Sequence, residues 1–89
     1  MAIKPDELEE LICEGKIDGI FAGFRNHDTI FKIQGAGSWR QDEYKFEYHH
    51  LFSPKAKIVK VIKKDPHREV FYLHVDGVKT QIEVKYAYV

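Results

Sequence analysis

The spacing of apolar residues changes after the first sixteen residues, from a helical repeat to the alternation that strands show. Leu8, Leu11 and Ile12 fall at i, i+3 and i+4, which places one apolar stripe on a helix. A proline precedes this stripe and a glycine follows it, where helices commonly begin and end. The pattern predicts an N-terminal helix within residues 1–16, which must dock on the rest of the chain because so short a helix is marginal alone.

After this segment, apolar and polar residues alternate with period two, which is typical of half-buried strands. Turn residues divide this part of the chain into about six strands. A turn at Asn26-His27 is expected to join the first two strands as a hairpin. The expected strands cover residues 17–25, 29–34, 39–52 and 55–64, followed by the two arms of a last hairpin.

Asp76-Gly77 marks this last hairpin, because the dipeptide is preferred in two-residue type I′ turns. Such a turn sets the register of the two strands that it joins. The expected pairs are Val75 with Val78, Leu73 with Thr80 and Phe71 with Ile82. One face of the hairpin is then apolar and the other largely polar, as in a sheet with one buried face.

The expected elements define a fold class. Eighty-nine residues hold one domain, and no segment is long enough for the helical crossover that parallel strands need. One short helix would leave a flat six-stranded sheet largely uncovered, whereas a bent sheet or barrel closes on itself. The sequence therefore predicts a single, mainly β domain over residues 1–89, with a helix within 1–16 and a bent antiparallel sheet or small barrel over 17–89.

Composition adds expectations about order and location. Hydrophobic residues make up 44% and charged residues 31% of the chain, which argues against disorder. Cys13 is the one cysteine, so no disulfide can form within the chain, which fits a reducing compartment. The sequence shows neither a signal peptide nor an apolar run long enough to span a bilayer. A cytoplasmic location without membrane association is expected.

The net charge of zero conceals an uneven distribution. Residues 1–19 carry six acids and two lysines, whereas residues 20–89 carry twelve basic residues and eight acids. The acidic segment either pairs with the basic remainder of the chain or forms a solvated helix face. The solvated face is the favoured interpretation.

Residue types that carry catalysis or bind metals are present without the patterns that these functions need. The five histidines show no HxH or HExxH spacing, and His49 and His50 are strand neighbours that point to opposite faces. Cys13 and the serines lack an adjacent base or a nucleophile-elbow spacing. Residues 35–38 are glycine-rich but lack the lysine of a phosphate-binding loop. We therefore expect no catalytic residue, no metal ligand and no cofactor, hence a protein that is not an enzyme.

A row of aromatic residues is the richest feature of the sequence. One face of the expected strand over 39–52 carries Tyr44, Phe46, Tyr48, His50 and Phe52. Such rings either fill the interior of a small barrel or stack the bases of a single-stranded nucleic acid. Nearby lysines that could contact phosphates are Lys55, Lys57, Lys60 and Lys63. The core is the favoured interpretation, and a nucleic-acid-binding barrel is the alternative.

Trp39, Arg40 and Gln41 follow the glycine-rich turn directly. A lone tryptophan beside an arginine at a loop–strand junction is typical of a recognition anchor, and it is equally typical of a plug at the end of a barrel. The favoured function is a non-catalytic module that binds a protein or peptide partner through Trp39, Arg40, Gln41, Tyr48 and His50. The oligomeric state is left open, with a homodimer among the alternatives.

The same residues carry a resemblance to known proteins. The patterns are, in order, Asp18-Gly19-Ile20-Phe21-Ala22-Gly23-Phe24, Thr29-Ile30-Phe31, Trp39-Arg40-Gln41, and Tyr48-His49-His50 followed by Ser53-Pro54-Lys55. In this order the chain resembles a family of small, uncharacterised bacterial proteins with SH3-like β barrels. The resemblance implies an SH3-like barrel and carries no activity. A looser likeness to the Sm-like fold, which binds single-stranded RNA, rests on Gly19, on Gly23-Phe24 and on Asp28-Thr29.

Overall fold

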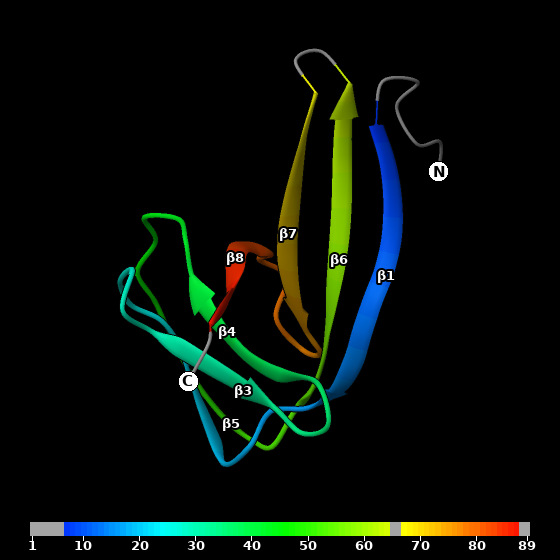
Figure 1. Cartoon of the computed structure of the whole chain (residues 1–89). Coiled ribbons are helices and arrows are strands. Elements are labelled where there is room, and N and C mark those ends of the chain that lie inside the picture. The colour runs from blue at the N-terminus through cyan, green and yellow to red at the C-terminus, as the bar shows by residue number, and fades with distance from the viewer. Residues whose placement is uncertain (1–6, 65–66, 88–89) are drawn as a thin grey trace.

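A computed structural model describes residues 7–64 and 67–87 of the chain, and all of their regular structure is antiparallel strand. Figure 1 shows three long strands standing side by side and shorter strands curling away from them. The strands are β1 (Glu7–Lys16), β2 (Ile20–Phe24), β3 (Ile30–Ile33), β4 (Gly37–Gln41), β5 (Glu47–Phe52), β6 (Lys55–Lys64), β7 (His67–Val75) and β8 (Ile82–Ala87).

A bent two-stranded ribbon organises the fold. β1 pairs with β6 and β2 pairs with β5, so the same two chain segments stay paired on both sides of a corner. At the corner, the Ser53 N–H donates to the Gly19 carbonyl (2.7 Å) and the Ile17 N–H to the Pro54 carbonyl (2.9 Å). Gly19 and Ser53 both have a positive φ, 82° and 47°, which turns the two strands together.

The two halves of the ribbon belong to different sheets. The larger sheet has the order β1-β6-β7-β8-β4-β3, and the smaller one consists of β2 and β5. The larger sheet curls until its two ends meet, where the Gln34 N–H donates to the Lys16 carbonyl and the Asp18 N–H to the Lys32 carbonyl (both 2.8 Å). The result is a curled antiparallel half-barrel, with β3 and β4 crossing beside the long strands (Figure 1).

The core fills the inside of this curl. Phe21 and Phe24 of β2 pack edge to face, with ring centroids 5.6 Å apart, and both rings lie 6.0 Å from that of Phe31. The buried core side chains are Ile17, Phe21, Phe24, Phe31, Ile33, Trp39, Ala56, Ile58, Leu73, Val75, Ile82 and Val84. The small sheet therefore covers the open side of the large one. This contact determines where the side chains of β2 and β5 lie.

The predicted N-terminal helix is wrong, because residues 7–16 form strand β1 along β6. Leu8 and Leu11 pair with Ile62 and Val59 and so lie on opposite faces of β1, and a β-bulge between Leu11 and Cys13 inserts Ile12 as an extra residue. Leu8 and Leu11 are 50% and 54% exposed and form no buried stripe. A strand satisfies the backbone groups of β6 along its whole length, which a two-turn helix could not do.

Most acidic residues of β1 lie opposite lysines of β6. Glu10 is paired in register with Lys60, whose Nζ lies 3.6 Å from the Glu10 carboxylate, and Glu14 is paired with Lys57. These side chains are largely at the surface, where an ion pair contributes about 0.2–1 kcal/mol. The uneven charge of the sequence is thus matched within the chain, and it favours this pairing of β1 over others.

One expected strand pairing and one expected strand differ from the structure. β2 and β3 do not pair with each other, since β2 pairs with β5 and β3 with β4. The long expected strand over 39–52 is divided into β4 and β5. The expected strand over 55–64 coincides with β6.

The last hairpin keeps its faces but not its register. Leu73 pairs with Ile82 instead of Thr80, a shift of two residues that leaves the same side chains in the core. The Val78 N–H still donates to the Val75 carbonyl, but positive φ is confined to Gly77 (87°), whereas a type I′ turn needs it at both central residues. The Asp76 N–H donates to the Lys55 carbonyl, which draws this turn toward β6.

Gly23→Ala should destabilise the fold far more than Gly19→Ala, although both glycines have a positive φ. A Cβ at Gly23 would meet the Glu47 carbonyl oxygen and lie 2.8 Å from the His49 nitrogen, whereas a Cβ at Gly19 would meet open space. We expect losses of about 3 kcal/mol or more and of about 1 kcal/mol, respectively. Urea denaturation followed by circular dichroism measures both, and equal losses would contradict the close approach of β2 and β5.

Candidate binding surface

Four aromatic side chains lie exposed on and beside β5, although the sequence favoured a place in the core for them. Their exposed fractions are 89% for Tyr44, 79% for Phe46, 72% for Tyr48 and 79% for Phe52. His50 is exposed between Tyr48 and Phe52. We call these five residues the aromatic row. Large exposed apolar patches are uncommon on monomeric proteins and mark interaction sites.

The inward face of β5 explains why the rings point outward. His49 stacks on the core residue Phe21, with ring centroids 5.8 Å apart. The Glu47 carboxylate contacts the His49 Nε2 at 2.6 Å and accepts a hydrogen bond from the Thr80 hydroxyl at 3.0 Å. Glu47, His49 and Leu51, which packs against the core, thus take the inner side of β5, and by alternation Tyr48, His50 and Phe52 face solvent.

The same polar cluster shifts the acidity of Glu47. Its pKa lies below the ordinary value of 4.5, first because of the hydrogen bond to His49 and then because of the hydrogen bond from Thr80. Glu47 is therefore a carboxylate at neutral pH and ties β5 to the segment that precedes β8.

Gln41 holds the segment that carries Tyr44 and Phe46. Its side chain is fully buried, and its Nε2 donates to the Glu43 and Lys45 carbonyls at 2.9 Å each. Its Oε1 accepts the Arg25 N–H at 3.0 Å, which joins the end of β4 to the end of β2. The oxygen and the nitrogen of the Gln41 amide are therefore both hydrogen-bonded. Because Tyr44 and Phe46 flank Lys45, this amide fixes the backbone between the two exposed rings.

A cleft of about 440 Å³ lies between β2 and β3. The buried rings of Phe21 and Phe31 line its base, and Ile20 and Ile30, 49% and 45% exposed, line its rim. One end is bounded by the hydrogen bond from Asp18 to the Lys32 carbonyl. The other end is bounded by the turn in which the Thr29 N–H donates to the Asn26 carbonyl at 3.0 Å.

The two walls of this cleft are strand edges. Within residues 7–64 and 67–87, β2 has a strand partner only on its β5 side and β3 only on its β4 side, apart from the bridge between Ile17 and Ile33. Alternate residues of a strand direct their main-chain groups to the same edge. On this basis Ile20 and Ile30 direct their N–H and C=O groups into the cleft.

Charged groups around the cleft are balanced. Its lining includes the carboxylates of Asp18 and Asp28 and the cationic side chains of Arg25 and Lys32. A cleft without excess charge of either sign favours an uncharged or mixed ligand over a polyanion.

The predicted binding residues Trp39, Arg40 and Gln41 do not form one surface. Trp39 is only 5% exposed, its Nε1 donates to the Ala36 carbonyl at 3.1 Å, and its ring packs against those of Phe71 and Tyr86. Gln41 is buried, and Arg40 is exposed on the outer side of β4. Tyr48 and His50, the other two residues of this hypothesis, belong to the aromatic row.

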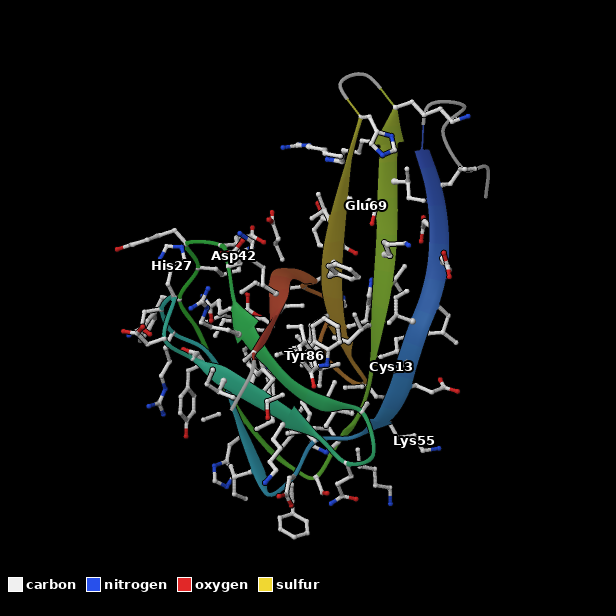
Figure 2. The ribbon with its side chains drawn as sticks, viewed as in Figure 1. Cys13, His27, Asp42, Lys55, Glu69 and Tyr86 are labelled. Atoms are coloured by element: carbon white, nitrogen blue, oxygen red, sulfur yellow. The ribbon has the colours of Figure 1, made fainter. Side chains whose placement is uncertain are left out.

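The lysines proposed to contact nucleic acid lie on β6, on the far side of the corner from the aromatic row. Figure 2 shows Lys55 at the lower end of this strand. Lys55, Lys57 and Lys63 share one face of β6, whereas Lys60 lies on the other face, near the carboxylates of Glu10 (3.6 Å) and Glu69 (3.8 Å). The structure therefore does not bring the four lysines and the rings together.

Cys13 and the histidines add no further site. Cys13, on β1 (Figure 2), packs against the core, and burial raises the pKa of its thiol. Over the described part of the chain, no group of three or more His, Cys, Asp or Glu side chains could hold a metal ion.

Comparisons of the chain with protein-family models, with curated proteins and with solved structures find no match. The resemblance to a small bacterial family therefore stays a prediction. In the segments that the structure describes, no helix is long and apolar enough to cross a membrane.

Sequence reasoning missed the cleft because it paired β2 with β3 through their short connection. One signal was available: Gly19 and Gly23 leave a bare strip along the first expected strand, where a bend or a close backbone approach is expected. The bend occurs at Gly19 and the close backbone approach at Gly23. Together they direct β2 away from β3 and toward β5.

Gln41→Leu should lower the free energy of unfolding by about 3 kcal/mol or more. It leaves the Arg25 N–H and the Glu43 and Lys45 carbonyls without their partner, and one unsatisfied buried group costs about 1–3 kcal/mol. Arg40→Leu, at the exposed neighbouring position, should change it by less than about 0.5 kcal/mol. Urea denaturation distinguishes the two, and a Gln41→Leu protein as stable as the wild type would contradict this role.

Glu47→Gln should reduce stability at pH 7 and have little effect near pH 3. Because the folded-state pKa of Glu47 is lowered, its contribution is present above the unfolded-state value and is lost as the pH falls through the folded-state value. Melting temperatures of both proteins between pH 3 and 7 should therefore converge in acid. Thr80→Val, which removes one donor to Glu47, should show part of the same dependence; a difference constant with pH would contradict it.

Proposed function

We propose that the protein is a non-catalytic interaction module that binds an extended peptide segment of a partner protein in the cleft between β2 and β3. The observation that carries this proposal is that two strand edges face each other across an apolar base. An SH3-like classification of the half-barrel, as the resemblance implies, belongs to the same proposal.

The cleft's chemistry favours a peptide. An extended peptide forms main-chain hydrogen bonds with strand edges, while alternate side chains enter pockets between them. The rings of Phe21 and Phe31 provide an apolar base for one such side chain, and Ile20 and Ile30 provide apolar contacts at the rim. The volume of about 440 Å³ lies within the range of about 300–1,000 Å³ that ligand sites occupy.

The polar side chains at one end of the cleft are hydrogen-bonded within their own turn. The Thr29 hydroxyl accepts the Asn26 N–H at 3.0 Å, and the Asn26 side-chain oxygen accepts the Asp28 N–H at 2.9 Å. These groups stabilise the turn that bounds the cleft.

A second candidate function is the binding of single-stranded nucleic acid, and the exposed aromatic row favours it. Bases stack on exposed rings with little dependence on sequence, each contributing about 1–3 kcal/mol. The balanced charges near the cleft and the separation of the β6 lysines from the rings favour the peptide.

Peptides selected from a random phage-displayed library on the full-length chain should contain an apolar anchor residue and bind in the cleft. In ¹⁵N-labelled protein, a selected synthetic peptide should shift the amide signals of Ile20, Ala22 and Ile30. Ile30→Lys should weaken its binding at least tenfold, because it places an ammonium group at the apolar rim.

Leu8→Lys is the matched control, since Leu8 has a similar exposure (50%) but lies on β1, and it should leave peptide binding unchanged. Failure to enrich any peptide, or binding that Ile30→Lys does not affect, would overturn the cleft as the site. A labelled dodecamer of deoxythymidine that binds at low salt, weakens steeply with added salt and is released by Tyr48→Ala would favour the nucleic-acid candidate instead.

A further inference from the structure

The outer edge of β5 is an unpaired strand edge that carries the aromatic row. Within the described residues, β5 has one strand neighbour, β2, in a two-stranded sheet. A free strand edge presents unpaired N–H and C=O groups and is a template for pairing with another chain. Here that edge bears rings of 72% and 79% exposure at Tyr48 and Phe52.

The main-chain groups available at this edge belong to the residues whose side chains form the row. At Gly23 of β2, an added Cβ would meet the Glu47 carbonyl oxygen and the His49 nitrogen, so the odd-numbered residues of β5 direct these groups toward β2. By alternation, Tyr48, His50 and Phe52 direct theirs to the free edge. An added strand would thus contact both the backbone and the rings of the same three residues.

The sequence of β5 is self-complementary in an antiparallel pairing. If two copies pair about a twofold axis at His50, Tyr48 of each copy lies opposite Phe52 of the other. Aromatic cross-strand pairs of this kind contribute roughly 0.2–1 kcal/mol each. This register also places the Glu47 side chains of the two copies at opposite ends of the interface.

The exposed ring surface supplies much of the area that such an interface needs. With about 150–250 Å² per aromatic side chain, the four rings expose roughly 600 Å² per copy. A standard interface buries about 800 Å² per partner.

The other strand edges are less suited to self-pairing. β1 carries Glu9, Glu10 and Glu14 and is interrupted by a bulge, so two copies of it would repel each other. The free edges of β2 and β3 face each other across the cleft, which is too confined for a second folded chain.

We propose that two copies of this chain associate through antiparallel pairing of their β5 edges, which joins the two small sheets into the four-stranded order β2-β5-β5-β2. This pairing uses the edge of β5 that faces away from β2. It therefore goes beyond the proposed peptide binding and does not rest on it.

Sedimentation velocity of the full-length chain between 5 and 500 µM tests the association. The wild type should sediment as a dimer at the upper concentrations. Phe52→Lys should weaken the dimer at least tenfold while leaving the circular dichroism spectrum unchanged. Leu11→Lys, at an exposed apolar position on β1, should leave the dimer intact, and so should Ile30→Lys in the cleft.

The register has its own test. Tyr48→Lys mixed with Phe52→Glu should restore dimers, because lysine and glutamate then face each other, whereas Phe52→Lys mixed with Phe52→Glu should not. In a Cys13→Ser background, oxidised His50→Cys should form a disulfide-linked dimer and Leu11→Cys should not.

A wild type that remains monomeric at 500 µM would overturn the proposal. A dimer that resists Phe52→Lys, or that Leu11→Lys disrupts, would also overturn it. Loss of the dimer in Phe52→Lys together with unchanged peptide binding would leave the cleft and the dimer edge as separate sites.

Discussion

The corner of the β1–β6 and β2–β5 ribbon is the constraint on which the rest of the structure depends. The hydrogen bonds of Ser53 to Gly19 and of Ile17 to Pro54 keep the two strands paired while both change direction. Because the pair bends as one unit, β2 and β5 cover the inside of the curled sheet without joining it. Three features follow from this: the phenylalanines of β2 enter the core, a cleft remains against β3, and the outer edge of β5 is free.

The orientation of β5 determines which of its side chains are available to a partner. His49 on Phe21, Glu47 with Thr80, and Leu51 against the core occupy the inner side. The His49 and Glu47 side chains are partly exposed, and their polar atoms are hydrogen-bonded to each other and to Thr80. Tyr48 and Phe52 are then exposed on the outer side of β5. Gln41 fixes the preceding segment, which carries Tyr44 and Phe46.

Local patterns in the sequence predicted much of the strand content and less of the pairing. The bounds of β6 and the inward residues of β7 and β8 follow from alternation and turn chemistry, which are local. The helix prediction failed because Leu8, Leu11 and Ile12 do not all share one face of β1, so their helix-like spacing marks no common buried stripe. Turn chemistry favoured pairing β2 with β3, yet the partner of a strand depends on contacts distant in sequence.

The candidate site could be predicted only in part, for the same reason. That Tyr44, Phe46, Tyr48 and Phe52 share a face follows from period two alone. Which face points inward depends on what lies across the core, here Phe21 of β2, and one strand's sequence does not contain this information. Trp39 shows the converse: its setting beside a glycine-rich turn fits an exposed anchor or a buried ring equally, and only the neighbouring rings of Phe71 and Tyr86 show that it is buried.

The ribbon also constrains how the chain can reach this structure. Its innermost pair, Phe24 with Glu47, encloses the whole segment that includes β3 and β4. Hairpins close quickly because their strands are adjacent in sequence, whereas pairing across such a distance must first overcome the entropy of closing a long loop. The β6–β7 and β3–β4 hairpins can therefore form early, with the ribbon and its corner completed last. Until then, the edge of β6 that pairs with β1 is uncovered. In the finished fold, the acidic β1 covers this lysine-rich edge.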